Sequence, residues 1–489
     1  MNCYLGVDIG TSSAKMVVID QKGDTIAQCS REYSFDQPKQ GWKEIDPDVW
    51  YVEVMKGLKD MLALVDRKRI KGIGITGQMH TVIFMGKDGK SIRPAIMWND
   101  NRTKECLAEL KENIKKVGDQ PFIEKIISTG SPAANLYWLK LNEPDNFKLL
   151  HKFLIGPDYL VYRFTGKMTT DYCEASTSSL YDIERRVWSK AVAELIGLSE
   201  NVYPQIKGSS EQAGLILDEV AEELGLSKGL AIITGTGDNP ATGVSSGCFS
   251  NTSPILSLGT SAVLMFRRSE LDLDAKGKNI LFSADGKLVH ILNQGVVQSA
   301  GNSYSWISKE ILEIEEFGKG TEEISIDRLG ENQVLFYPHL AGEKTIYGDP
   351  ALKGAFIGLT LDTKRMDLLI AVMEGVSFGI RQLMDEMKLA HLDVLRVTGG
   401  GSNSTVWMQI LSDILNVKVE TILAGSGASQ GVALLSAYAN GEFTSLDEIG
   451  GKAIKANKTY YPRSYNTSLY DDQYRKYRKI YTALKAITD

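Results

Sequence analysis

Cysteine is scarce in this sequence, and the few cysteines present are not arranged as a disulfide framework or a zinc site. Among 489 residues there are five, and no two of them form a Cys-x-x-Cys pair. An odd number of scattered cysteines is typical of reduced thiols, so we expect a cytoplasmic protein. The cysteines are Cys3, Cys29, Cys106, Cys173 and Cys248.

The sequence also lacks any cluster of lysine and arginine. Its 55 basic residues are outnumbered by 61 acidic residues, which gives a formal net charge of -6. Without a basic patch a protein has no electrostatic means of holding nucleic acid or an anionic membrane. We therefore expect its partners to be small molecules.

Long apolar runs are missing as well. No apolar segment approaches the length that spans a bilayer. Residues 1–8 lead straight into a strand-like pattern, without the charged start and apolar stretch of a signal peptide. We expect neither membrane insertion nor secretion.

The remaining composition is that of an ordinary globular protein. Hydrophobic residues make up 43% and charged residues 24% of the chain, which is typical of folded proteins. A chain of 489 residues exceeds what one hydrophobic core usually supports. At least two domains are therefore expected.

The first part of the chain has the pattern of an antiparallel meander followed by a helix. Branched residues are frequent in segments 5–7, 15–20 and 25–33, which are separated by turn residues. Asp46 and Pro47 are a typical cap and first-turn residue, and apolar residues then recur at helical spacing. A further strand is expected over 70–76.

The second half begins in a similar way. Segments 254–258 and 262–266 are strand-like and are joined by a Gly-Thr-Ser turn at 259–261, which aligns with Gly10-Thr11-Ser12 in the first half. We interpret this similarity as an internal duplication. It favours two α/β domains that meet at a cleft.

Later, a strand at 395–398 and three glycines at 399–401 precede a helix with apolar residues from Val406 to Leu415. We expect Ser402 or Asn403 to cap this helix. The apolar stripe predicts core packing, not a ligand site.

The two Gly-Thr-Ser turns are candidates for phosphate binding. Glycine lets the backbone approach an anion, and N–H groups and hydroxyls donate to it. Asp8 precedes the first turn, whereas Ser257 occupies the matching place in the second. A carboxylate beside phosphates needs a cation between them, so Asp8 is a candidate for Mg²⁺, directly or through water. The alternative is a turn aspartate that bonds its own backbone.

Asp238 is the candidate general base. It follows a glycine-rich strand end at 234–237, and Asn239-Pro240 has the pattern of a cap and first turn of a helix. A carboxylate at this place can accept the proton of an attacking sugar hydroxyl. Alternatively, Asp238 is itself the helix cap.

Two further segments have side chains suited to sugars. Gln78 and His80 follow the strand at 70–76 and can hydrogen-bond hydroxyl groups, although a lone histidine is more often structural. Trp98, Asp100 and Arg102 combine a flat apolar ring with an acid and a base. This mixture suits sugar binding and equally suits an ordinary surface ion pair.

Taken together and in this order, these segments resemble the FGGY family of carbohydrate kinases over nearly the whole chain. Within the family the similarity is greatest to members that act on xylulose, because relatives that act on glycerol or gluconate carry different residues in the Gly77-Gln-Met-His80 block. The similar blocks are 8–15, 77–80, 93–102, 235–239, 256–261, 337–343, 354–359, 367–374 and 399–403.

The resemblance implies an α/β fold of two ribonuclease H-like (actin-like ATPase) domains with a cleft between them. An N-terminal domain, 1–245, would hold the sugar and the base, and a C-terminal domain, 246–489, would hold the nucleotide. ATP and Mg²⁺ are the implied cofactors, with Asp238 as base, Asp8 catalytic beside the metal, and D-xylulose as the leading substrate.

The resemblance also implies the binding residues. The implied substrate contacts are Gln78, Met79, His80, Trp98, Asp100, Arg102, Asp238 and Asn239. The implied nucleotide contacts are Thr11, Ser12, Ser13, Lys15, Gly259, Thr260, Ser261, Gly400, Gly401 and Asn403.

Two positions depart from the family pattern. Asn135 stands where the family usually has lysine, and Lys344 stands where arginine is common. Lysine lacks the planar fork of arginine, so a bidentate contact at this position would change.

Three alternatives stay open: a family member for another ketose or polyol (ribulose, erythritol, glycerol or gluconate), an actin-like nucleotide switch, and a non-catalytic sugar sensor. Relatives often form homodimers, but nothing in the sequence marks an interface.

Overall fold

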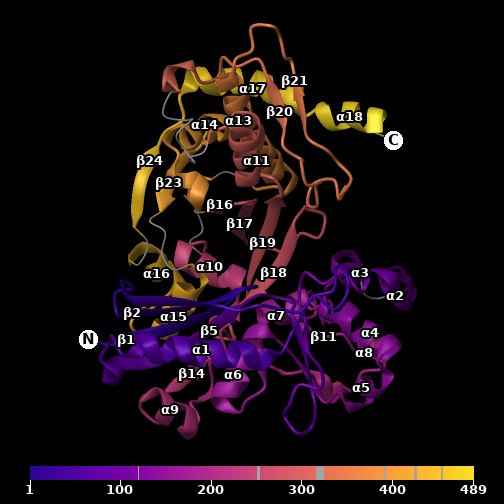
Figure 1. The fold of residues 1–489 in the computed structure, drawn as a ribbon, viewed down its shortest axis with the longest axis vertical. Coiled ribbons are helices and arrows are strands. Elements are labelled where there is room, and N and C mark those ends of the chain that lie inside the picture. The colour runs from indigo at the N-terminus through magenta and orange to yellow at the C-terminus, as the bar shows by residue number, and fades with distance from the viewer. Residues whose placement is uncertain are drawn as a thin grey trace. The chain divides into compact units, whose positions relative to one another are not determined.

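The chain folds into two compact units in this computed structural model, which describes residues 1–118, 121–249, 254–314, 324–389, 392–422, 427–452 and 455–488 (Figure 1). Unit 1 comprises Met1–Gly247, Ile280–Leu292 and Gly425–Ala453. Unit 2 comprises Cys248–Asn279, Asn293–Ala424 and Ile454–Asp489. Each unit has its own sheet and its own core.

The main sheet of unit 1 begins with the expected meander. Strands β1 (Cys3–Ile9), β2 (Ser13–Asp20) and β3 (Thr25–Glu32) pair antiparallel in sequence order, and β5 (Ile70–Gly77) runs parallel to β1. The sheet order is β13-β14-β5-β1-β2-β3, with β15 also paired to β5. The predicted meander and the strand at 70–76 are confirmed.

Helix α1 (Pro47–Leu62) begins where the sequence predicted. The carboxylate of Asp46 accepts the backbone N–H of Asp48, and Pro47 occupies the first turn. Trp50, Val54 and other apolar residues of the helix are buried, as expected from their spacing.

Beyond these elements, unit 1 contains a smaller sheet, the other strands of the main sheet, and further helices. The smaller sheet has the order β4-β7-β6-β8. The remaining elements of unit 1 are β4 (Glu44–Ile45), β6 (Val82–Met85), β7 (Ala95–Ile96), α2 (Lys104–Val117), α3 (Pro121–Ile126), α4 (Pro132–Asn142), α5 (Pro144–Leu149), β8 (Lys152–Ile155), α6 (Gly156–Thr165), β9 (Thr169–Asp171), α7 (Tyr172–Thr177), β10 (Tyr181–Asp182), β11 (Val187–Trp188), α8 (Lys190–Ile196), β12 (Gln205–Lys207), β13 (Gln212–Leu215), α9 (Asp218–Leu224), β14 (Ala231–Ile233), β15 (Thr236–Gly237), α10 (Asp238–Ser246), α15 (Ala428–Ala439) and α16 (Leu446–Lys452).

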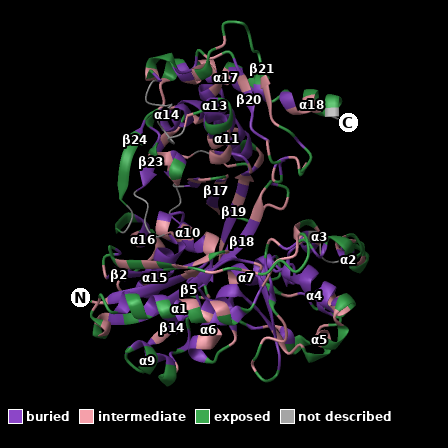
Figure 2. Cartoon of the chain, in the orientation of Figure 1, coloured by how far each residue is buried: buried purple, intermediate pink, exposed green. Residues whose placement is uncertain are grey.

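Helix α15 packs directly on the backbone of its neighbours in unit 1. A Cβ added at Gly6 in β1 or at Gly74 in β5 would overlap the carbonyl oxygens of Ser429 and Val432 in this helix. A Cβ added at Gly431 would overlap the carbonyl oxygen of Ala241 in α10. Most of α15 is buried as a result (Figure 2).

Unit 2 repeats the arrangement of unit 1. Strand β16 (Ile255–Leu258) pairs antiparallel with β17 (Ala262–Arg268) and parallel with β22 (Val394–Thr398), as β1 does with β2 and β5. The sheet order is β18-β19-β17-β16-β22-β23-β24. The predicted internal duplication is confirmed.

Besides β16, β17 and β22, unit 2 contains further strands and helices, two of which are long helices that contribute to its core. They are β18 (Lys278–Phe282), β19 (His290–Val297), α11 (Gly301–Trp306), β20 (Leu335–Tyr337), β21 (Ala355–Ile357), α13 (Arg365–Glu386), α14 (Thr405–Leu415), β23 (Lys418–Ile422), β24 (Ala456–Tyr460), α17 (Ser464–Tyr477) and α18 (Ile480–Thr488). The chain passes between the units within β18 and β19.

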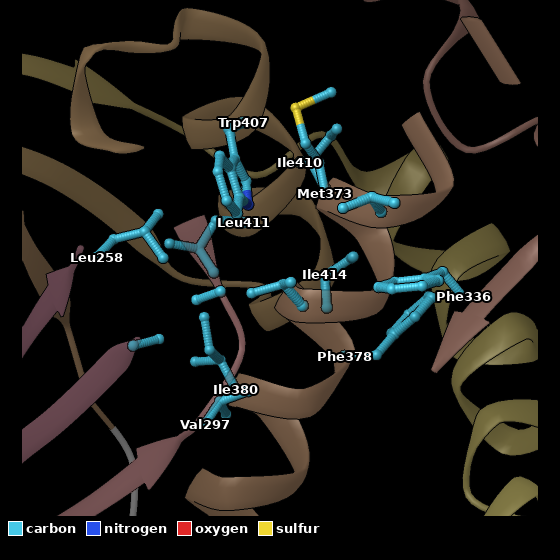
Figure 3. Close-up of a cluster of buried hydrophobic side chains, with 14 of the residues drawn as sticks. Leu258, Val297, Phe336, Met373, Phe378, Ile380, Trp407, Ile410, Leu411 and Ile414 are labelled. Atoms are coloured by element: carbon cyan, nitrogen blue, oxygen red, sulfur yellow. The ribbon is translucent and has the colours of Figure 1, made fainter. Parts of the chain in front are cut away.

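The apolar stripe of α14 packs in the core of unit 2, as predicted (Figure 3). Trp407 and Ile414 of this helix join Met373 and Phe378 of α13 in one cluster. The predicted cap is wrong, because the N–H of Trp407 bonds the hydroxyl of Ser404 at 3.2 Å. A 3-10 turn over Gly400–Asn403, which includes two of the three glycines, precedes the helix.

All five cysteines lie in the described residues, and none of them forms a disulfide bond. Within the described part of the chain, no helix is both long enough and apolar enough to cross a membrane.

Substituting Gly431→Ala should destabilise unit 1, because the new methyl group forces α15 and α10 apart. We expect a loss of about 1–3 kcal/mol, or more, in the free energy of unfolding, measured by urea unfolding followed by circular dichroism. Gly451→Ala in α16 is the matched control, since its methyl group would meet open space. Equal stability of the two variants would contradict the close packing of α15.

Candidate active site

A cavity of about 710 Å³ in unit 1 collects most of the predicted catalytic groups. Three parts of the unit line it: the strands β1–β3, the start of α10, and the start of α15. The lining residues are Asp8, Lys15, Met16, Gln28, Cys29, Ser30, Asp238, Asn239, Thr242, Gly427, Ala428 and Ser429. Asp8, Lys15, Asp238 and Asn239 were predicted as site residues, and the structure brings them together.

Asp8 lies near the end of β1, directly opposite Lys15 in the antiparallel ladder. Opposed residues point to the same face of a sheet, so a carboxylate and an ammonium group share this wall. The Oδ1 atom of Asp8 is shielded from solvent and has no hydrogen-bond partner among the described residues. Burial raises the pKa of Asp8 to about 6, and the charge of Lys15 partly opposes that rise.

The carboxylate oxygens of the cavity fit a hard cation that is bound by few protein ligands. No group of three or more His, Cys, Asp or Glu side chains that could hold a metal ion occurs among the described residues. Mg²⁺ needs only one or two protein carboxylates, because water and phosphate oxygens complete its shell. The unpartnered oxygen of Asp8 is suited to that role.

The first Gly-Thr-Ser turn is fixed by three hydrogen bonds to the main chain. The N–H of Gly10 donates to the carbonyl of Ser13 at 2.9 Å. The carbonyl of Gly10 accepts from the hydroxyl of Tyr33 at 2.6 Å and from the side-chain amide of Gln78 at 3.2 Å. Gln78 is buried, so its amide nitrogen holds the turn. Tyr33 was not predicted, since nothing in its local sequence marks it.

Trp98 reaches the same turn from another segment. Its ring N–H donates to the hydroxyl of Thr11 at 3.1 Å, while 46% of the residue stays exposed. Ser12 of the same turn is exposed and Ser13 is partly buried. An exposed aromatic face beside hydroxyl groups can stack on a sugar ring.

Asp100 and Arg102 do not form the surface ion pair that was the alternative expectation. Both side chains are fully buried, and the guanidinium makes two bonds to Asp100, at 2.9 and 2.8 Å, and one to Glu44 at 2.6 Å. Arg102 also stacks on Trp42, with 4.0 Å to the ring centroid. These donors are engaged within the protein, which favours a role in holding the loop that carries Trp98.

Asp238 is the first residue of α10. The N-cap of this helix is Gly237, which has no side chain that could bond the helix. The expectations that Asn239 or Asp238 caps this helix are therefore both wrong. The amide of Asn239 instead contacts the sulfur of Met79 at 3.4 Å. Asp238 and Asn239 both line the cavity, and Met79 is buried behind Gly237.

His80 has a left-handed backbone, with a φ of 68°, which is uncommon for residues other than glycine. Glu174 of α7 is buried close by, since a Cβ placed on Gly237 would be 2.9 Å from its Oε1 atom. Glu174 and Ser429 were missed by sequence reasoning, because neither belongs to a local motif.

The predicted nucleotide residues of unit 2 form a group of their own. The N–H of Gly259 donates to the carbonyl of Ser261 at 3.0 Å, and the carbonyl of Thr260 accepts from the N–H of Ala300 at 3.1 Å. Gly399, with a φ of 91°, and Gly401 both lie against Leu258. The structure thus places the 259–261 turn beside the 399–401 glycines within unit 2.

Gly400 and Asn403 lie in the adjoining 3-10 turn. A Cβ on Gly400 would meet nothing within 4 Å. This open glycine backbone is compatible with a flat base lying against it.

The two departures from the family pattern differ in their surroundings. Asn135 is buried in α4, where its amide donates to the carbonyl of Gly130 at 3.2 Å. Lys344 is exposed. Its neighbour Glu343 is buried and holds the loop, since its carboxylate accepts backbone N–H groups from Thr345, Ile346, Tyr347 and Gly348.

The duplicated architecture, with an antiparallel meander followed by parallel strands in each unit, is that of ribonuclease H-like, actin-like ATPases. Residues 3–245 match the N-terminal domain of the FGGY family of carbohydrate kinases, and residues 255–440 match its C-terminal domain. The chain belongs to this family. It is a carbohydrate kinase, and membership implies ATP as the phosphoryl donor and a sugar as the acceptor.

Individual relatives extend over the whole chain. A xylulose kinase of Bacillus subtilis is 31% identical over 491 residues, with 99% of this chain and 98% of the relative covered. One of Staphylococcus xylosus is 30% identical over 492 residues, covering 98% of this chain and all of the relative.

Solved structures show the same fold. A structure of a xyloylose kinase from Brucella ovis has a TM-score of 0.90 and 30% identity, covering 99% of this chain and 100% of that chain. A gluconate kinase from Lactobacillus acidophilus reaches a TM-score of 0.89 at 24% identity, covering 99% of this chain and 98% of that chain.

Substituting Asp8→Asn should stabilise the protein at neutral pH while it abolishes ATP turnover. The pKa of Asp8 rises from 3.8 to about 6 on folding, so ionising it opposes folding as pH rises through this range. We expect a gain of about 1–3 kcal/mol at pH 7.5 that disappears below about pH 4. Urea unfolding without Mg²⁺ or nucleotide measures it.

The exposed Asp362→Asn is the control and should change stability little at either pH. If Asp8→Asn were no more stable than the native protein at pH 7.5, the burial that we assign to this carboxylate would be wrong.

Proposed function

We propose that this kinase phosphorylates D-xylulose to D-xylulose 5-phosphate. The observation that carries the proposal is the similarity, over nearly the full length of the chain, to relatives named xylulose kinase. The Gln78-Met79-His80 segment adjoins Asp238 and Asn239 through the contact between Met79 and Asn239, which supports a sugar site at this place.

In the proposed reaction Asp238 is the general base. Its carboxylate accepts the proton of the 5-hydroxyl group while that oxygen forms a bond to the γ-phosphorus of ATP. The bond from this phosphorus to the β–γ bridging oxygen breaks, and ADP leaves with the electron pair. The position of Asp238 at the first residue of a helix, on the wall of a cavity, supports this role.

The sugar would be bound by the segments around this base. Met79, His80 and Asn239 would contact its hydroxyl groups, and Trp98 would lie against its carbon chain. Gln78, Asp100 and Arg102 would act mainly by fixing the turn at Gly10 and the loop of Trp98, because the amide nitrogen of Gln78 and the charged groups of Asp100 and Arg102 are already engaged there.

In unit 1 we assign the phosphates of ATP to Thr11, Ser12, Ser13 and Lys15. In unit 2 we assign the remaining contacts to the turn at 259–261 and to Gly400, Gly401 and Asn403. The exposed charge of Lys15 on the cavity wall supports a phosphate contact.

Asp8 would bind Mg²⁺, directly or through water. When bound, the metal ion neutralises charge that builds up on the phosphate oxygens. Asp8 lines the cavity, and its Oδ1 atom has no competing hydrogen bond among the described residues.

Asp238→Ala should lower sugar-stimulated ADP release by about 10²–10⁴-fold, while ATP binding is unchanged, because the loss is confined to proton transfer. The assay is ADP release with Mg-ATP and each of D-xylulose, D-ribulose, L-ribulose, L-xylulose, erythritol, glycerol and gluconate. Retained turnover in the variant would refute the role of Asp238.

Asp218→Ala is the matched control, because Asp218 is also the first residue of a helix, α9, but is exposed and lies outside the cavity. It should behave as the native protein. Stimulation by a different sugar of the panel would overturn D-xylulose and keep the mechanism, whereas stimulation by none would overturn the kinase activity on these substrates.

A further inference from the structure

Gly130 lies directly against the loop that carries Trp98. Its backbone is left-handed, with a φ of 82°, a conformation that glycine adopts at no steric cost. A Cβ placed on Gly130 would be 2.4 Å from the carbonyl oxygen of Trp98 and 3.5 Å from that of Asp100. The backbone of Gly130 and the backbone of this loop are therefore in contact, and the position of one limits the position of the other.

Two buried side chains hold the peptide groups of Gly130. Its N–H donates to the hydroxyl oxygen of Thr103 at 3.2 Å, and its carbonyl oxygen accepts from the side-chain amide of Asn135 at 3.2 Å. Thr103 and Asn135 are both 0% exposed. Thr103 comes directly before α2 and Asn135 lies in α4, so Gly130 is fixed from two helices at once.

Thr103 does not perform the role that its place in the chain would suggest. It is the N-cap residue of α2, yet its side chain makes no hydrogen bond to that helix. A threonine at this position usually accepts an N–H of the first turn and so stabilises the helix. Here the hydroxyl accepts the N–H of Gly130 instead, which indicates that holding Gly130 outweighs capping α2.

Near Gly130, two buried polar atoms are not engaged within the described part of the chain. They are the Oδ1 atom of Asn135 and the hydroxyl oxygen of Ser131. An aliphatic side chain at position 135 would leave no such atom unsatisfied. The interaction that explains an asparagine in this buried place is therefore the bond from its amide nitrogen to Gly130.

Trp98 is held at two other points. Its backbone N–H donates to the hydroxyl of Thr81 at 3.1 Å, and its ring N–H donates to that of Thr11 at 3.1 Å. Gly130 lies against the carbonyl group of the same residue. These three contacts keep the indole ring beside the first Gly-Thr-Ser turn, and a shift of Gly130 would move it.

We propose that Asn135 and Thr103 are positioning residues of the sugar site, which hold Gly130 against the loop of Trp98 and so fix the indole ring that lies along the sugar. This inference rests on the proposed function, because Trp98 is assigned there to the sugar. Both residues act through Gly130, and neither touches the reacting atoms.

Two substitutions remove one bond each and nearly keep the size of the side chain: Asn135→Leu and Thr103→Val. Thr103→Ser keeps the hydroxyl and is the conservative counterpart. Asn142→Leu is the matched control. Asn142 is the last residue of α4, and its amide also donates to a backbone carbonyl, that of Trp138 at 3.1 Å.

Two properties are measured for each variant, at a temperature at which circular dichroism shows that it is folded. One is the exchange of backbone amide hydrogens in the peptides that contain residues 97–101 and 128–131. The other is kcat and KM for the accepted sugar and for ATP.

Asn135→Leu and Thr103→Val should each speed amide exchange in both peptides, because Gly130 loses one of its two bonds. They should lower kcat/KM for the sugar by about 10- to 100-fold, with the KM for ATP unchanged. Thr103→Ser should stay within about threefold of the native values, since its hydroxyl still accepts the N–H of Gly130. Asn142→Leu should behave as the native protein.

Native exchange and native sugar kinetics in Asn135→Leu and Thr103→Val would overturn the proposal. An equal loss in Thr103→Ser would overturn it as well, because the bond to Gly130 would then not be the cause. If Asn135→Leu does not fold, the two Thr103 variants decide. If the native protein phosphorylates no sugar of the panel, the proposed function fails, while amide exchange still decides whether the two side chains hold Gly130 and the loop of Trp98.

Discussion

The close contact between α15 and the main sheet of unit 1 is the constraint on which the candidate site depends. At Gly6, Gly74 and Gly431 the helix meets neighbouring backbone with no room for a side chain. This contact brings Ser429, at the start of α15, onto the wall of the cavity that Asp8 and Asp238 also line. The lack of a side chain at these three glycines therefore determines how closely α15 packs on the sheet and on α10, and so how the wall of the cavity is formed.

A second constraint comes from the buried polar groups of the loop that carries Trp98. Arg102 is enclosed between Trp42 and two carboxylates. Removing one member of such a group leaves an uncompensated charge in a buried place, which is strongly destabilising. The loop of Trp98 is consequently held by charge pairing as well as by packing, and this rigidity suits a site that must fix a flexible ligand.

Much of the fold could be predicted from the sequence, because local patterns determine it. The meander at the N-terminus, helix α1 and the repeated strand–turn–strand unit follow from alternating branched residues and from turn chemistry. Helix starts were less predictable. The caps at Gly237 and Ser404 lie one or two residues from those expected, since several neighbouring residues were chemically able to cap.

The candidate site could be predicted only where it consists of local motifs. Asp8, Lys15 and Asp238 belong to such motifs and lie in one cavity. Tyr33, Glu174 and Ser429 could not be predicted, because their roles depend on which distant segments pack beside them. The same reason explains why Asp100 and Arg102, which suited a sugar by residue type, are enclosed instead in a buried network.

The division of unit 1 into three stretches of chain bears on how the protein is made. Its last stretch, Gly425–Ala453, contains α15 and follows most of unit 2 in the sequence. During synthesis, Asp8 and Asp238 are translated before α15, the helix whose start lines their cavity. The surfaces of β1 and β5 that α15 covers are exposed until then, so folding of unit 1 can finish only after most of unit 2 has been translated.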